Sequence, residues 1–135
     1  MLGVTLTDLK QIYHPKGDIY HIIKKSDATF NGFGEAYFSA VKTGEIKGWK
    51  KHSKMTLNLV VPVGEVKFVI YDGEHGSFFS VNLSHNNYKR LTIKPNLWVA
   101  FQGIGESNLV LNVADLEHNP QEAINMDLDR VDYEW

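Results

Sequence analysis

The segment from Gly44 to Thr56 holds the densest group of residues able to do chemistry. Between Lys47 and Thr56 it contains four lysines, one histidine and one tryptophan. Lysine binds phosphate as a point charge, and the imidazole of His52 can act as a base near neutral pH. This pattern indicates a site for an anionic ligand such as a diphosphate.

The same segment is also typical of a solvated edge strand, because lysines protect exposed strand edges from pairing. In an extended strand alternate residues face the same side. The segment then sorts into two sets, with Lys50, His52 and Lys54 on one side and Trp49, Lys51 and Ser53 on the other. The residues alone leave both interpretations open.

Composition excludes several classes of protein. The 135 residues fit one domain spanning residues 1–135, and 43% of them are hydrophobic, enough for a substantial core. Fourteen basic residues against 16 acidic ones give a net charge of −2, which argues against nucleic acid as a partner. The absence of cysteine excludes a disulfide framework, a thiolate metal site and a cysteine nucleophile.

No signal peptide or membrane span is visible. The N-terminus lacks a basic region followed by an apolar run, and the longest strongly apolar stretch is Leu59–Val63, which Pro62 interrupts. A membrane span needs about 20 apolar residues. We therefore expect a cytoplasmic protein with no membrane partner.

The elements that position these residues read as short strands, because alternation of period two dominates. About nine are expected, at residues 10–14, 19–24, 34–42, 54–62, 65–72, 77–83, 89–94, 97–102 and 108–114. Helices are expected only around residues 7–12 and 120–126. Short strands at this spacing predict an all-β sandwich or barrel. The tail ends in Tyr133, Glu134 and Trp135, whose aromatic rings we expect to be docked.

The run Ile46–His52, followed by Lys54–Thr56, resembles the Arg/Lys-Gly-x-His-x-His/Gln signature of a cupin family. The family is that of the nucleotide-sugar epimerases and isomerases related to dTDP-4-dehydrorhamnose 3,5-epimerase. The resemblance extends over roughly residues 17–135. It continues through Gly64–Val66, Leu83–Asn96 and Trp98–Phe101, and is strongest to a short branch with a Lys-Gly-Trp-His-x-His-x-x-Met-Thr pattern.

The resemblance implies a double-stranded β-helix (a jelly roll), a homodimer, and a nucleotide-linked 4-keto-6-deoxyhexose in the mouth of the barrel. It also implies chemistry without a cofactor. A proton next to the 4-keto group is removed, and the resulting enolate leads either to an epimer or to the isomeric ketone. The product would serve bacterial surface polysaccharide synthesis.

Three acid–base positions depart from the family pattern. The first histidine of the signature is Lys50, the late-strand tyrosine falls near Leu111, and the histidine of a later run falls at Val99. Three interpretations of Lys50 stay open. In the first, Lys50 is a base with a depressed pKa. In the second, Lys50 is a cation that binds the ligand, and His52 is the base. In the third, the protein has lost the activity and binds a nucleotide sugar without converting it.

Six further residues are candidates for binding the substrate. Lys47 and Lys54 offer cations, Trp49 and Trp98 offer rings that stack on a sugar or a base, and Asn58 and Tyr37 offer polar groups. Tyr37 is also a candidate to replace the missing tyrosine acid. No metal is expected, because Lys50 breaks the histidine pair with which many cupins hold one.

Overall fold

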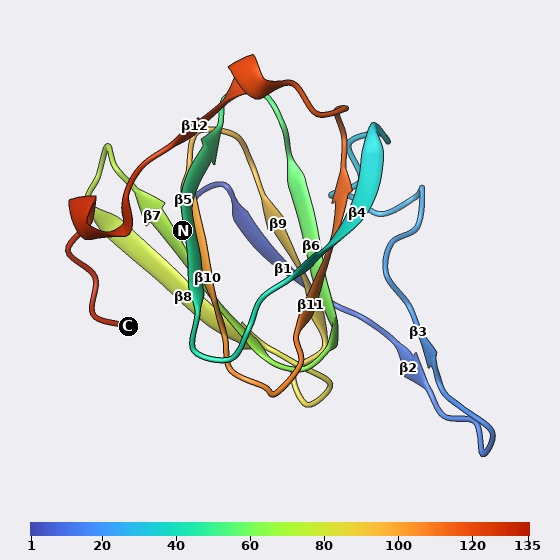
Figure 1. The fold of residues 1–135 in the computed structure, drawn as a ribbon. Coiled ribbons are helices and arrows are strands. Elements are labelled where there is room, and N and C mark those ends of the chain that lie inside the picture. The colour runs from blue at the N-terminus through green and yellow to red at the C-terminus, as the bar shows by residue number, and fades with distance from the viewer.

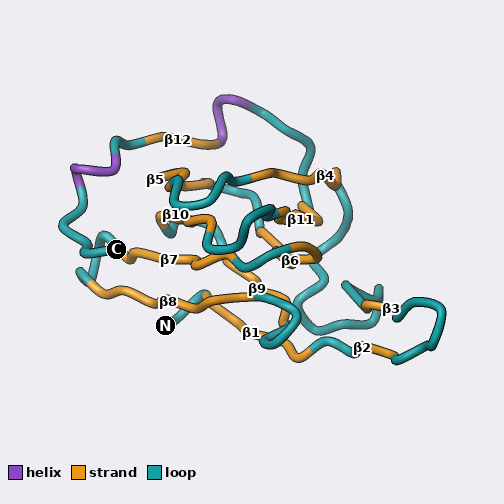
Figure 2. Tube along the Cα trace, turned by 60° about the horizontal axis from the view of Figure 1, so that its bottom comes forward, coloured by secondary structure: helices purple, strands orange, loops and turns teal.

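The computed structural model describes residues 1–135 and is built from strands that form two five-stranded sheets. The first sheet has the order β1-β9-β6-β11-β4, and the second has the order β12-β5-β10-β7-β8. All of the pairs within these sheets are antiparallel. Figure 2 shows the two sheets as facing layers, with the small β2–β3 hairpin standing apart from both.

Nine of the twelve strands overlap the expected segments, whereas β1, β5 and β12 lie outside them. In the first sheet they are β1 Val4–Asp8, β4 Glu35–Ala40, β6 Leu57–Val63, β9 Lys89–Ile93 and β11 Leu109–Ala114. In the second they are β5 Ile46–His52, β7 Val66–Asp72, β8 Ser77–Leu83, β10 Trp98–Gly103 and β12 Ala123–Asn125. The projecting hairpin consists of β2 Gln11–Ile12 and β3 Ile19–Tyr20 (Figure 1).

A jelly-roll sandwich was predicted, and the fold confirms it. The inward side chains of both sheets meet in one apolar cluster of 15 buried residues, among them Leu59, Phe68, Ile70 and Leu91. Burial of such side chains contributes about 1.5–3 kcal/mol each and holds the sheets together. No helix of the structure is long and apolar enough to cross a membrane.

Both predicted helices are wrong. Residues 7–12 fall on the end of β1 and on β2, because Val4–Asp8 pairs along its whole length with β9. Residues 120–126 form a 3-10 turn, η1 (Pro120–Glu122), and then β12, which pairs with β5. A second 3-10 turn, η2 (Leu128–Arg130), follows. In both segments tertiary pairing overrides local preference.

The C-terminal tail is docked, as predicted. It crosses the outer face of the second sheet, where Tyr133 and Trp135 pack against a small cluster that contains Trp49 and Val69 (Figure 1). The rings of Trp49 and Trp135 lie 6.1 Å apart between centroids. The tail therefore covers the side of β5 that faces away from the core.

Candidate functional site

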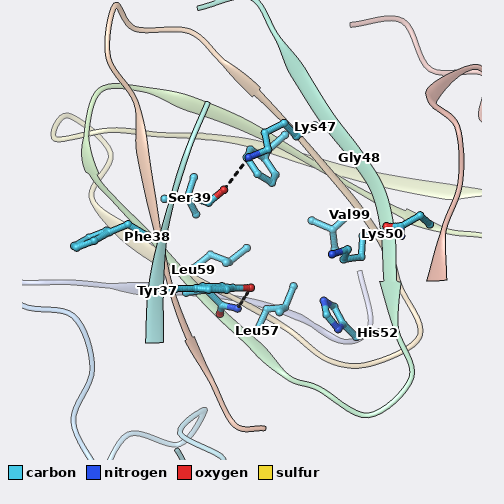
Figure 3. A pocket seen from close by; sticks show the side chains of 14 residues that line it. Tyr37, Phe38, Ser39, Lys47, Gly48, Lys50, His52, Leu57, Leu59 and Val99 are labelled. Carbon is cyan, nitrogen blue, oxygen red and sulfur yellow. Dashed lines mark hydrogen bonds between the residues drawn. The ribbon is translucent and has the colours of Figure 1, made fainter. Parts of the chain in front are cut away.

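A cavity of about 410 Å³ lies between the two sheets, at the end where β4 and β5 face each other. Strand β5 contributes its basic wall, strands β4 and β11 contribute a polar wall, and β6 and β10 contribute mainly apolar side chains. Figure 3 shows Tyr37, Lys47 and His52 directed into the space between the two walls, whereas the ring of Phe38 points away from it. The lining residues are Tyr37, Phe38, Ser39, Lys47, Gly48, Lys50, His52, Leu57, Leu59, Val99, Phe101, Val110, Asn112 and Asn125.

A β-bulge in β5 sets which residues reach this cavity. Lys47 pairs with Phe101 and Lys50 pairs with Val99, so Gly48 and Trp49 together oppose the single residue between them. The extra residue shifts the alternation by one position. As a result Lys47 and Lys50 both face the cavity, although they are three residues apart in sequence.

Glycine is required at the bulge for two reasons. Gly48 has φ of 155°, which a residue with a side chain rarely adopts. A Cβ at this position would also collide with Ala100 on β10. The glycine of the Lys-Gly-Trp motif therefore gives β5 the shape that aims two lysines at one ligand.

His52 is oriented by Glu122, which sequence reasoning missed. Its Nδ1 and the Glu122 carboxylate form a very close hydrogen bond, and the side chains are only 12% and 6% exposed. The backbone N–H groups of Lys54 and Met55 donate to the other carboxylate oxygen over 3.1 and 3.2 Å. Glu122 lies 70 residues from His52 in sequence, and no motif marks it.

These contacts favour the ionised form of Glu122 and select the tautomer of a neutral His52 imidazole. Burial raises the pKa of Glu122, but the hydrogen bonds from His52, Lys54 and Met55 outweigh burial, so the pKa lies below its ordinary value. An ionised carboxylate only accepts hydrogen bonds, so Nδ1 of His52 carries a proton. The other ring nitrogen, Nε2, is left with a lone pair and can act as a base.

The two lysines of the cavity differ in their surroundings. Nζ of Lys47 donates to Ser39 Oγ over 3.0 Å and to the carbonyl oxygen of Ala40 over 3.1 Å, which links β5 to β4 across the cavity. Lys50 takes part in none of the four ion pairs of the chain. Its ammonium group is therefore free to meet an anionic ligand.

The opposite wall carries a tyrosine. Tyr37 on β4 is the cross-strand neighbour of Asn112 on β11, and Nδ2 of Asn112 donates to the Tyr37 hydroxyl over 3.2 Å. Tyr37 is 44% exposed and lines the cavity, so it is not a packed core residue. Leu111, at which the resemblance placed the family's tyrosine, pairs with Phe38 and does not line the cavity.

Four of the eight predicted site residues meet in the cavity, and four do not. Tyr37, Lys47, Lys50 and His52 line it. Trp49, Lys54, Asn58 and Trp98 do not line this cavity, and each has a local reason.

The two tryptophans lie on the outer face of the second sheet. Trp49 is 1% exposed, packs in the cluster under the tail, and directs Nε1 to the carbonyl oxygen of Leu128 over 3.4 Å. Trp98 pairs with Lys51, whose ammonium lies 4.8 Å from its ring centroid. These rings serve packing and a cation–π contact.

Lys54 and Asn58 are turned away by the chain between β5 and β6. Strand β5 ends at His52, so alternation no longer aims Lys54 at the cavity. On β6, Leu57 and Leu59 face inward, and Asn58 faces outward. There its Oδ1 accepts from the buried Arg90 and from Thr92 over 3.1 and 2.6 Å. Asn58 is a structural residue.

The groups placed closely enough to share a metal ion are Asp72, Glu74 and His75, at the exposed turn between β7 and β8. They do not line the cavity. Within the turn, Nδ1 of His75 and Oδ2 of Asp72 are 2.8 Å apart.

Comparison with known proteins agrees with this architecture. The family model described as WxcM-like, C-terminal (FdtA) matches residues 2–132. No curated protein sequence matches the chain.

Among solved structures, a dTDP sugar isomerase from Desulfovibrio desulfuricans is 34% identical, with a TM-score of 0.94 over 99% of this chain and 91% of that chain. Two others share the fold at lower identity. The first is a mutant of the 3,4-ketoisomerase QdtA from Thermoanaerobacterium thermosaccharolyticum, in complex with TDP-4-keto-6-deoxyglucose. It is 22% identical, with a TM-score of 0.80 over 92% of this chain and 88% of that chain.

The second is the epimerase RmlC from Legionella pneumophila, in complex with dTDP-4-keto-L-rhamnose. It is 17% identical, with a TM-score of 0.87 over 100% of this chain and 79% of that chain. The match over residues 2–132 and the shared architecture confirm the family resemblance: this chain belongs to the WxcM-like C-terminal (FdtA) family and has its jelly-roll, cupin-like fold.

Proposed function

We propose that the protein is an isomerase of a nucleotide-linked 4-keto-6-deoxyhexose and that it works without a cofactor. The observation that carries this proposal is the oriented imidazole of His52, whose free Nε2 belongs to a cavity that also holds two lysines. The dTDP sugar isomerase that is 34% identical to the chain supports the substrate class.

The reaction begins at the carbon next to the ketone. Nε2 of His52 takes the C3 proton, the electron pair of that C–H bond forms a C3=C4 double bond, and the ketone oxygen becomes an enolate. Glu122 stabilises the imidazolium that forms. General-base catalysis of this kind contributes about 10²- to 10⁴-fold in rate.

The lysines supply the positive charge that the reaction needs. We assign Lys50 to the enolate oxygen, since a cation in a sheltered cavity favours developing negative charge. We assign Lys47, which Ser39 and Ala40 hold at the cavity, to the diphosphate. Of the three interpretations of Lys50, we adopt the cation with His52 as the base.

A second copy of the chain is the proposed partner. On β4, at the edge of the first sheet, Phe38 pairs with Leu111 and is 64% exposed. A second copy of the chain would bury this exposed apolar side chain, and we propose a homodimer. Sedimentation at the mass of a dimer is expected, and a species of about 15 kDa would contradict it.

Turnover of TDP-4-keto-6-deoxyglucose in D₂O, followed by proton NMR, tests the activity. We expect the C3 proton signal to disappear and signals of an isomeric sugar to grow. A protein without activity would show neither change. The product would supply a sugar for bacterial surface polysaccharide.

The alternative is a cup that binds a nucleotide sugar without converting it. It is favoured by Lys50 and Val99, which stand where the resemblance implies histidines. Saturable binding of TDP by calorimetry, together with no proton exchange at high protein concentration, would establish this alternative.

A further inference from the structure

The two lysines of the cavity are held in different ways, although both belong to β5. An ammonium group has three N–H donors. Nζ of Lys47 donates to Ser39 and to the carbonyl oxygen of Ala40, so one donor is left for a ligand. Lys50 is exposed, and its Nζ takes part in none of the ion pairs of the chain. Lys47 is therefore a fixed cation, whereas the amine of Lys50 is free to move.

The two lysines and His52 stand in a row along one wall of the cavity (Figure 3). On β10 the partners of the two lysines are two residues apart, at Phe101 and Val99. On β5, His52 follows Lys50 by two residues. Two residues of a strand span about 6.6 Å. A small molecule bound to Lys47 is therefore within reach of the Lys50 amine, which in turn lies next to the imidazole.

This row combines an anion-binding cation, a nucleophile and a base. Lysine binds phosphate as a point charge, and an uncharged lysine amine is a nucleophile that a neighbouring base activates. Nε2 of His52 is such a base, because Glu122 keeps the proton on Nδ1. The 14 residues that line the cavity include no aspartate and no glutamate. An anionic reagent therefore enters without repulsion from a carboxylate.

We propose that Lys50 is a site of covalent acylation by small acyl phosphates, such as acetyl phosphate. An acyl phosphate joins an anionic phosphate to an electrophilic acyl carbon. Lys47 binds the phosphate, and the acyl carbon then lies beside the amine of Lys50. This modification goes beyond the proposed function, because it needs only the three side chains of the row and no sugar.

The transfer balances in atoms and charge. The lone pair of the uncharged Lys50 amine forms a bond to the acyl carbon, and the π electrons of the carbonyl group move to its oxygen. Nε2 of His52 takes a proton from the nitrogen. The carbonyl group forms again, and the C–O bond to phosphate breaks with its electron pair. The proton on His52 passes to the departing phosphate, so the products are an amide at Lys50 and inorganic phosphate.

Acylation changes the charge of the cavity. It converts the cation of Lys50 into a neutral amide and removes a partner for anions. Only Lys47 then remains as a cation, and the added acyl group takes up part of the cavity. The modification therefore weakens the site for anionic ligands when acyl phosphate is abundant.

Acetyl phosphate is the probe, and Lys54 is the internal control. Lys54 is exposed like Lys50 but lies outside the cavity. Tandem mass spectrometry of one peptide that contains both residues measures their acetylation over time. We expect the initial rate at Lys50 to exceed that at Lys54 at least tenfold and to saturate with acetyl phosphate. Inorganic pyrophosphate, which competes for Lys47, is expected to lower the rate at Lys50 to that at Lys54.

Two variants test the anchor and the base separately. Lys47→Met removes the cation that binds phosphate, and His52→Asn removes the base but keeps a polar side chain. We expect each variant to lower the acetylation rate of Lys50 at least tenfold and to leave that of Lys54 unchanged. Circular dichroism and the melting temperature establish that each variant is folded.

Three results would overturn the inference. In the first, Lys50 and Lys54 react at equal rates. In the second, the rate at Lys50 rises in proportion to acetyl phosphate and does not respond to pyrophosphate, as for any exposed amine. In the third, Lys47→Met and His52→Asn leave the rate at Lys50 unchanged. Labelling is measured without a sugar, so a protein that labels at Lys50 but turns over no nucleotide sugar would contradict the proposed function alone.

Discussion

Both faces of β5 carry lysine side chains, but the surroundings of these side chains differ between the two faces. On the inner face, Lys47, Lys50 and His52 line the cavity. On the outer face, Trp49 is buried under the C-terminal tail, and Lys51 lies over the ring of Trp98. A lysine or an aromatic ring in this motif therefore takes its role from the face to which the bulge at Gly48 assigns it.

This contrast predicts that inner-face changes alter chemistry and that outer-face changes alter stability. The largest effect is expected for Trp49→Ala, which removes a fully buried ring. Such truncations cost about 3–5 kcal/mol of folding free energy. Urea unfolding should show this loss, while kcat of the fraction that is folded stays within about twofold of wild type.

The matched inner-face change is Lys50→Met, which keeps a long side chain but removes the charge. We expect kcat to fall by about 10²-fold, in the range reported for loss of one group that stabilises developing charge. The free energy of unfolding should change by less than about 0.5 kcal/mol, since Lys50 has no ion-pair partner to lose. A loss of stability without loss of kcat would reverse the roles of the two faces.

The variant Glu122→Gln tests the inner face through the pH dependence of the free energy of unfolding. The folded-state pKa of Glu122 lies below its unfolded value, so its carboxylate stabilises the fold above the unfolded pKa, near 4.5. That stabilisation is lost as the pH falls through the lower, folded-state value. Urea unfolding between pH 7 and pH 3 should therefore show a gap between wild type and Glu122→Gln that narrows on acidification. A gap that widens would contradict the assignment.

The smallest effect is expected for Lys54→Met. Lys54 stands in the motif but lies outside the cavity, and only its backbone N–H contacts Glu122. We expect kcat/KM to remain within about twofold of wild type, and the free energy of unfolding to remain within about 0.5 kcal/mol of it. A loss of more than tenfold in kcat/KM would place Lys54 at the ligand after all.

Most strands of the core were predictable because one face of each is apolar, and alternation of period two reports that directly. β1 and β5 were not among the expected strands. The bulge in β5 was not predictable, because one extra residue changes the face on which Lys47 lies and leaves the composition of the strand unchanged. Trp49 was assigned to the ligand because a tryptophan next to cations suggests stacking, whereas its burial depends on a tail that begins about 80 residues later.

The site was predictable only in part, for a similar reason. His52 and Lys50 stand in a local motif. Glu122 and Asn112, which form hydrogen bonds with His52 and Tyr37, reach them from distant parts of the sequence. The resemblance pointed to Leu111 on β11, whereas the tyrosine that lines the cavity, Tyr37, lies on the neighbouring strand β4. Contacts of this kind follow from strand register, which the sequence pattern does not report.

The most direct test of the account compares two neighbouring residues on opposite faces of β5. The measurement is the rate at which the C3 proton of TDP-4-keto-6-deoxyglucose exchanges in D₂O, for His52→Asn and for Lys51→Met. The account predicts a loss of at least about 10²-fold for His52→Asn and an unchanged rate for Lys51→Met. Exchange that survives in His52→Asn, or that falls equally in both variants, would contradict it.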